Sequence, residues 1–152
     1  MINSSKDSLN DQLIVHLKNC FEGNPWYGRS ILYLLDKYHP LSPQSKSILA
    51  HITVWRTFVN RALNNDIQVI ELNSPQDWPS ENQSEKELIK NLKKSQTDLV
   101  RSIATFKPSL WNHKIEGAKY TYFDLVQGVI DHDLYHLGQI VIIEKRLLKD
   151  LS

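Results

Sequence analysis

The sequence predicts an all-α protein, an antiparallel four-helix bundle with one extra short helix after the first long helix. Two observations predict this fold. Apolar residues recur at helical intervals in four long segments, and helix-capping residues precede those segments. Strand signals are weak by comparison. A length of 152 residues suits one domain, so residues 1–152 are expected to form a single domain in which residues 1–7 are a flexible N-terminus.

Five helices are predicted, and each begins with a recognisable cap. Three begin with a capping box, in which Ser or Thr is followed three residues later by an acidic residue. Two begin with Asn-Pro or Ser-Pro, where the first residue caps the helix and proline takes the first helical position. The expected segments are, in chain order, about Leu9–Glu22, Pro25–Lys37, Pro43–Leu63, Glu85–Thr105 and Thr121–Leu148.

The longest irregular stretch, residues 64–83, lies between the third and fourth of these helices and contains several turn-forming dipeptides. Residues 67–72 have the composition of an extended segment, but one short strand has no partner in this sequence. A connection of this length is more often functional, or a crossover, than a passive link.

The composition excludes several classes of function. The formal net charge is +1 with acidic and basic residues mixed along the chain, so no nucleic-acid partner is expected. No apolar run approaches the length of a membrane span and no secretory signal is recognised, so no membrane partner is expected. The single cysteine, Cys20, cannot form an intrachain disulfide and suits a reducing compartment. The expected location is the cytoplasm.

Two histidines of the last helix, His132 and His136, give the strongest functional signal. Their spacing of four residues places both imidazoles on one helix face, about 6 Å apart along the axis and within an apolar stripe. His51 lies on the apolar face of another long helix, which a bundle can bring to the same level. Such residues are either hydrogen-bonded core histidines or ligands of one metal ion, because burying unpaired imidazoles is unfavourable. Three neutral imidazoles suit zinc, nickel or iron(II).

Four stretches of the chain resemble motifs of the DinB superfamily, the DinB/YfiT-like metalloenzymes. The resemblance covers nearly the whole chain, from Asn24 to about Arg146, and the last stretch is the most specific. The stretches are Asn24-Pro25-Trp26-Tyr27-Gly28, His51 with Trp55-Arg56, Asp77-Trp78-Pro79, and His132-Asp133-x-x-His136-x-Gly138-Gln139-Ile140. The resemblance implies a four-helix bundle that holds one divalent metal ion per chain through His51, His132 and His136.

The resemblance also implies a range of activities. Several members of the superfamily resemble glutathione S-transferases and use bacterial low-molecular-weight thiols such as bacillithiol or mycothiol. Others are metal-dependent hydrolases, and many are stress-induced proteins with no known reaction. The expected function is therefore a thiol S-transferase with a small-molecule substrate and a low-molecular-weight thiol as co-substrate. The alternatives are a hydrolase that activates a water molecule and a non-catalytic metal-binding module of a stress response. A homodimer is also expected, because the apolar arc of the last helix is wide enough to contact a second subunit.

Six further residues are candidates for the surroundings of the metal. The expected pocket residues are Trp26, Tyr27, Trp55 and Tyr135. Core packing is the simpler expectation for Trp55, whereas Trp26 and Tyr27 are better pocket candidates because they begin a short helix after a turn. Asp133 and Gln139 are weaker candidates, and either could orient a ligand histidine or a substrate.

Two other classes of metal enzyme share part of the last motif. His132-Asp133-x-x-His136 matches the zinc-protease pattern His-Glu-x-x-His with aspartate in place of glutamate. Aspartate is one methylene shorter, and an all-helical chain offers no sheet edge to align a peptide, so this function is disfavoured. The adjacent pair His132-Asp133 also occurs in HD phosphohydrolases, where both residues bind metal. Neighbouring residues diverge by about 100° on a helix, so the i, i+4 histidine pair is the simpler ligand set.

Overall fold

The computed structural model describes residues 8–79 and 82–151, and within them the protein is all-helical, as predicted. The predicted flexible segment, residues 1–7, lies outside the described residues. In the described ranges there is no strand, only an isolated bridge between Lys114 and Thr121. The helices are α1 (Leu9–Glu22), α2 (Ile31–Lys37), α3 (Pro43–Leu63), α4 (Glu85–Thr105), the 3-10 turn η1 (Pro108–Leu110) and α5 (Tyr122–Asp150).

Local capping explains where the long helices begin. Each predicted capping box is formed: the hydroxyl accepts a hydrogen bond from the third backbone N–H of the helix, and the acidic side chain accepts one from the cap residue. Ser42 caps α3 ahead of Pro43, and its hydroxyl accepts a hydrogen bond from the backbone N–H of Ser45. The three capping boxes are Ser8 with Asp11, Ser84 with Glu87, and Thr121 with Asp124.

The start of α2 differs from the prediction. The helix begins at Ile31 instead of Pro25, and residues 24–30 form an irregular connection. Gly28 has a φ of 151°, a backbone conformation that an α-helix cannot include and that favours glycine. Ser30 then provides the cap, because its hydroxyl accepts a hydrogen bond from the backbone N–H of Tyr33. The predicted Asn24-Pro25 cap therefore lies in the connection.

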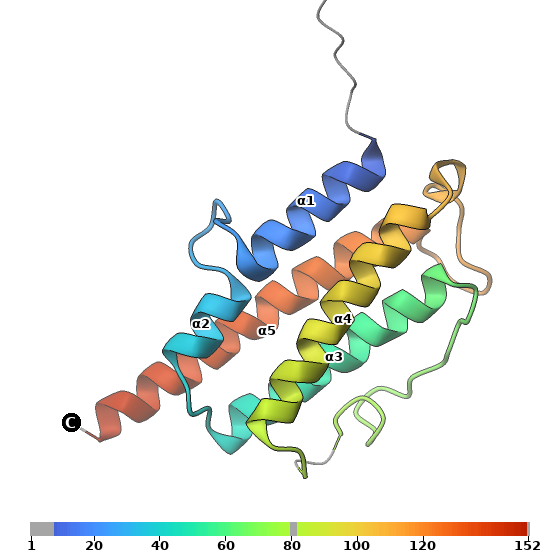
Figure 1. Cartoon of the computed structure of the whole chain (residues 1–152). Helices are drawn as coiled ribbons and strands as arrows, with labels where there is room; N and C mark the ends of the chain where they lie inside the picture. The colour runs from blue at the N-terminus through green and yellow to red at the C-terminus, as the bar shows by residue number, and fades with distance from the viewer. Residues whose placement is uncertain (1–7, 80–81, 152) are drawn as a thin grey trace, which may run out of the picture.

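The four long helices α1, α3, α4 and α5 lie side by side, with the short α2 next to α1 (Figure 1). α3 packs against both α4 and α5, and α1 packs against α4. Figure 1 also shows that α3 and α4 run in the same direction, opposite to α1 and α5. The connection of residues 64–84 allows this. At up to ~3.3 Å per extended residue it can return along α3, whose 21 residues span about 31 Å. The fully antiparallel arrangement of the prediction therefore does not apply to α3 and α4.

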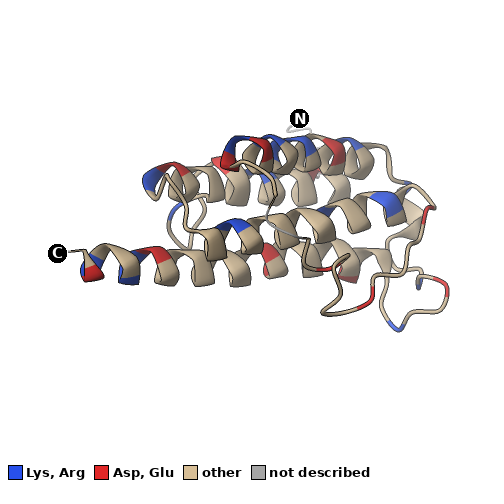
Figure 2. Ribbon diagram, turned by 90° about the horizontal axis from the view of Figure 1, so that it is seen from below, with Lys and Arg blue, Asp and Glu red and all other residues tan. Residues whose placement is uncertain are grey.

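Acidic and basic residues are mixed along the helices (Figure 2). Among the helices that the structure describes, none is both long enough and apolar enough to cross a membrane. Residues 67–72 form no strand, which agrees with the absence of a partner segment in the sequence.

The core consists of two apolar clusters separated by a layer of buried polar side chains. One cluster joins α1 to the second halves of α3 and α4 and to the first half of α5. The other joins α2 to the first halves of α3 and α4 and to the second half of α5. The polar layer, at the middle of the three longest helices, is formed by Arg56, Ser95, Gln96 and Asp133. The three histidines lie close to this layer in the chain, which places the site at mid-length of α3 and α5.

Candidate metal centre

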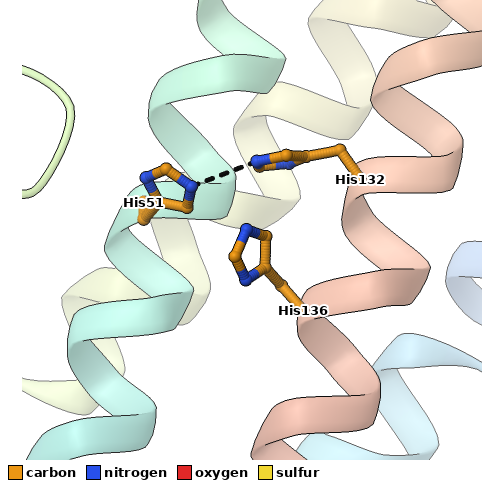
Figure 3. Close-up of side chains that lie close together, drawn as sticks. All are labelled: His51, His132 and His136. Carbon is orange, nitrogen blue, oxygen red and sulfur yellow. Dashed lines mark hydrogen bonds between the residues drawn. The ribbon is translucent and has the colours of Figure 1, made fainter. Parts of the chain in front are cut away.

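Three histidines from two neighbouring helices meet beside the polar layer. His51 comes from α3, and His132 and His136 lie one turn apart on α5. One ligating nitrogen from each lies within 4.8 Å of the others, and Nε2 of His51 is 3.1 Å from Nε2 of His132. Figure 3 shows the three rings turned toward one point between the helices. Two nitrogens on one tetrahedral zinc, each about 2.0–2.1 Å from the ion, are roughly 3.3 Å apart, so the distance between His51 and His132 fits a shared ion.

The hydrogen bonds of two imidazoles leave Nε2 available as a ligand. Nδ1 of His51 lies 2.9 Å from the backbone carbonyl oxygen of Asp77 and 2.9 Å from its carboxylate Oδ1. Nδ1 of His136 lies 2.6 Å from Oε1 of Gln139. Because these oxygens only accept hydrogen bonds, each Nδ1 carries the proton and each Nε2 keeps its lone pair. Metal-ligating histidines in proteins are held in the same way.

The surroundings favour the neutral form of His132 and of His136. Burial lowers the pKa of His132 to about 4, with a further contribution from His136 and His51 nearby. Burial also lowers the pKa of His136, against the opposing effect of the hydrogen bond to Gln139. Metal binding requires a deprotonated ring nitrogen, so both residues are ready to ligate at neutral pH. Nδ1 of His132 is buried without a hydrogen-bond partner in the part of the chain described, so no acceptor there fixes the tautomer of this residue.

The connection between α3 and α4 covers His51 with Asp77 and Trp78. The buried Asp77 carboxylate accepts hydrogen bonds from Nε1 of Trp55 and from the backbone N–H of Asn73, each at 2.8 Å. Burial alone would raise the pKa of Asp77, but these hydrogen bonds and the nearby imidazoles outweigh burial and lower it. The Trp78 ring stacks on the His51 ring, with centroids 3.8 Å apart and an interplanar angle of 4°. The ionised carboxylate and the stacked ring together hold the orientation of His51.

Sequence reasoning did not assign Asp77 or Trp78 to the site. The available signal was the Asp77-Trp78-Pro79 stretch itself, in which an acid and a large aromatic ring stand together within the longest irregular connection. A connection of that length is more often functional than passive. Only the folded chain shows that this stretch returns to contact α3.

Two of the four predicted pocket residues lie beside the histidines. The ring centroid of Trp55 is 6.1 Å from that of His132, and the Trp55 indole is held by Asp77. Tyr135 packs edge-on against His136, with ring centroids 5.0 Å apart, while most of its side chain remains exposed. Trp55 therefore forms part of the inner wall of the site, and Tyr135 lies at its outer rim.

The other two predicted pocket residues, Trp26 and Tyr27, are placed elsewhere. The Trp26 side chain is fully exposed. The Tyr27 side chain is partly exposed, and its hydroxyl donates a hydrogen bond to the backbone carbonyl oxygen of Cys20 at 3.5 Å. Both residues precede α2, in the irregular connection where a helix was expected. Neither residue contacts the three histidines in the described structure, and their role in a pocket stays a prediction.

The two weaker candidates have different partners. Gln139 accepts the hydrogen bond from His136, whereas Asp133 is buried in the polar layer and accepts a hydrogen bond from Arg56. Arg56 also donates to Oγ of Ser95 at 2.9 Å and to Oε1 of Gln96. Burial raises the pKa of Asp133 to about 6, although the Arg56 guanidinium opposes this shift. The Asp133 side chain thus ties α5 to α3, and its role in orienting a histidine or a substrate stays a prediction.

Two cavities flank the three histidines. One, of about 280 Å³, has His132 in its wall and is otherwise almost entirely apolar. The other, of about 530 Å³, is bounded by Trp78 and Gln139, the side chains that contact the other two histidines. A third cavity, of about 550 Å³, lies along α3, α4 and their connection, and no histidine lines it. Of these three cavities, the one of about 280 Å³ is therefore the one that reaches a histidine of the site.

Comparisons of the chain with models of known protein families, with curated proteins and with solved structures found no match. The resemblance to the DinB superfamily therefore remains a hypothesis that rests on the motif residues. The resemblance implies a metal site with one histidine from the second long helix and two from the last. The structure brings together three histidines from these helices, α3 and α5.

Proposed function

We propose that the protein is a metal-dependent enzyme of the DinB type, in which His51, His132 and His136 hold one divalent metal ion per chain. The observation that carries this proposal is the convergence of three imidazoles whose ligating nitrogens lie within 4.8 Å of one another. Acceptors at Nδ1 of two of them support coordination through Nε2. The proposal includes the fold, a four-helix bundle of the DinB kind in which α3 and α5 bring the ligands together.

The ligand set indicates which ions suit the site. Three imidazoles suit zinc, nickel or iron(II), and three protein ligands leave positions open, as in catalytic rather than structural sites. When bound, such an ion would act as a Lewis acid that favours the ionised form of a thiol or a water molecule. The Asp77 carboxylate contributes one negative charge beside His51. With a divalent ion the centre would carry a net charge of about +1, which still attracts an anion.

Among the reactions open to such a site, we favour transfer of a low-molecular-weight thiol to a small electrophile. The thiol sulfur forms a bond to carbon, the bond from that carbon to its leaving group breaks, and the leaving group departs with the electron pair. The thiol proton passes to solvent. This reaction needs two organic substrates, and two cavities flank the histidines. Hydrolysis needs one organic substrate and water, and we favour the transferase mainly because of the resemblance to the DinB superfamily.

The larger of the two cavities suits the thiol. Its wall combines the polar side chains of Gln44, Ser47 and Gln139 with apolar ones, including Trp78. Low-molecular-weight thiols carry polar groups that require hydrogen-bond partners when they leave water. Trp78 covers one face of His51 and so shields that ligand from solvent.

Metal-dependent conjugation tests this function. Metal-free protein and protein loaded with zinc, nickel or iron(II) are incubated with an electrophile, a chlorinated dinitrobenzene or bromobimane, and with each of a panel of cellular thiols. We expect turnover with at least one thiol, only in a metal-loaded sample, and none in His51→Ala. His113→Ala, which changes an exposed histidine outside the site, is the matched control. Absence of metal-dependent turnover with every thiol contradicts the transferase, and ester cleavage by the loaded protein without a thiol would indicate the hydrolase.

A further inference from the structure

The smaller cavity, beside His132, has the size and the wall of a binding site for an apolar group. Its volume is about 280 Å³, and its wall includes Trp55, Val59, Leu125 and Val129. An enclosed apolar cavity of about 150 Å³ is enough to bind benzene, and the cavity at His132 is larger but opens to solvent at Asp124 and Gly128. The cavity at His132 can therefore accept one substituted aromatic ring, or an aliphatic group of similar size.

Gly128 keeps this cavity open. It lies inside α5 and lines the cavity. A Cβ atom added at Gly128 would meet no atom within 4 Å, so no packing contact requires glycine at this position. Glycine inside a helix is less favourable than alanine by about 0.5–1 kcal/mol. Glycine at position 128 thus makes α5 less stable than alanine would, and it leaves free the space beside His132 that a side chain would occupy.

The charges around the cavity favour an uncharged guest. Asp124 is the acidic residue of its wall, and hydrogen bonds from the backbone N–H and the hydroxyl of Thr121 lower its pKa, so it is ionised at neutral pH. The described residues place no lysine or arginine in the wall. An anionic group would meet the Asp124 carboxylate without a cationic partner, and a cationic group would lose hydration against apolar walls.

We propose that this cavity is the subsite for an uncharged, apolar, ring-sized group of the electrophilic substrate. The inference rests on the proposed function and adds the chemical class of the second substrate and the place where it binds. Because His132 forms part of the wall, a carbon atom attached to the bound ring lies next to one of the three histidines. The polar thiol uses the other cavity, at Trp78 and Gln139. Gly128 is then a specificity-determining residue, since any larger residue reduces the space for the ring.

Toluene is a suitable probe of the cavity, because it is uncharged, apolar and unreactive. Zinc-loaded protein with labelled methyl groups is titrated with toluene and followed by NMR. We expect the methyl signals of Val59, Leu125 and Val129 to shift together, because these residues line the cavity. In Gly128→Leu the leucine side chain fills the cavity. The dissociation constant for toluene should then rise at least about tenfold, which corresponds to about 1.4 kcal/mol.

Gly138→Leu is the matched control. Gly138 is also an exposed helical glycine of α5 at which an added Cβ meets no atom within 4 Å, but it does not line this cavity. Leucine is a better helix former than glycine, so both variants should be at least as stable as the unmodified protein. Toluene affinity should fall in Gly128→Leu and stay unchanged in Gly138→Leu. Gly128→Ala should give an intermediate affinity.

Several results would overturn the inference. One is a set of toluene-induced shifts that excludes the cavity methyl groups, and another is an equal affinity in Gly128→Leu and Gly138→Leu. If Gly128→Leu alters the monomer–dimer equilibrium in sedimentation while toluene affinity is unchanged, the cavity belongs to a contact between two copies instead. The zinc content of the same samples separates this inference from the proposed function. If toluene binds in the cavity of a protein that retains no zinc, the subsite is supported and the metal centre is contradicted. If the protein retains zinc but toluene does not bind in the cavity, the metal centre is supported and the subsite is contradicted.

Discussion

Replacing Gln139 by methionine tests whether His136 is held as a metal ligand. Oε1 of Gln139 lies 2.6 Å from Nδ1 of His136, and no other acceptor for this N–H is seen among residues 8–79 and 82–151. Methionine has a similar length and shape but lacks a strong acceptor. The substitution would leave the N–H without its partner and free the ring to adopt another tautomer or orientation. Removal of such a partner lowers metal affinity by about 10–100-fold, or roughly 1.4–2.7 kcal/mol.

We expect a loss near the upper end of this range, because the hydrogen bond is short and His136 is buried. The dissociation constant for zinc is measured near neutral pH by competition with a chromophoric chelator. Gln139→Glu is the matched control, since a carboxylate of the same length keeps the acceptor and should bind zinc at least as tightly as the unmodified protein. Thermal unfolding of the metal-free proteins establishes that all three are folded. Unchanged zinc affinity in folded Gln139→Met would refute the argument that Gln139 positions a ligand.

Three further predictions follow from the contacts around the site. Asp77→Ala should lower zinc affinity by only about tenfold in the same competition assay, because the backbone carbonyl oxygen of residue 77 still accepts a hydrogen bond from Nδ1 of His51. A loss of zinc affinity as large as that in Gln139→Met would contradict this prediction. Asp133→Leu should lower the free energy of unfolding in urea by about 3–5 kcal/mol, because it leaves Arg56 buried without its carboxylate. The zinc stoichiometry of this variant should be unchanged, and loss of zinc from the folded variant would make Asp133 part of the metal site. The pKa of His132 is lowered in the folded state, from 6.5 to about 4, so the unfolded chain takes up this proton first as the pH falls. The contribution of His132 to the stability of the metal-free protein should therefore be complete above pH 6.5 and fall progressively toward pH 4. Because the raised pKa of Asp133 acts in the opposite sense over part of this window, the contribution is measured as the difference in urea midpoint between the unmodified protein and His132→Ala, and a difference that stays constant would contradict the shift.

The starts of the long helices were predictable because capping signals are local. Ser42-Pro43 begins α3 as predicted, whereas the same type of signal at Asn24-Pro25 does not begin a helix. The difference arises a few residues later, where Gly28 adopts a positive φ and Ser30 offers a second cap. A cap residue raises the stability of a helix start by about 1 kcal/mol, so competing caps can move a short helix, whose total stability is small.

The histidine cluster was predictable in part, and its surroundings were not. The spacing of His132 and His136 places both on one helix face, and His51 lies on the apolar face of another long helix. The resemblance to a known metal site then groups the three. The remaining contacts depend on how distant segments pack. Asp77 and His51 are 26 residues apart in the chain, and Arg56 and Asp133 are 77 residues apart. Periodicity within one helix indicates which face is buried, but it carries no information on which residue of another segment lies opposite.

Metal stoichiometry tests the central claim, that the three histidines hold one metal ion, most directly. The purified unmodified protein, His132→Ala and the control His113→Ala are loaded with zinc, freed of excess metal and measured by elemental analysis. We predict one equivalent per chain in the unmodified protein and in His113→Ala, and loss of the bound metal in His132→Ala. Full occupancy in His132→Ala, or no retained metal in the unmodified protein, would contradict the claim.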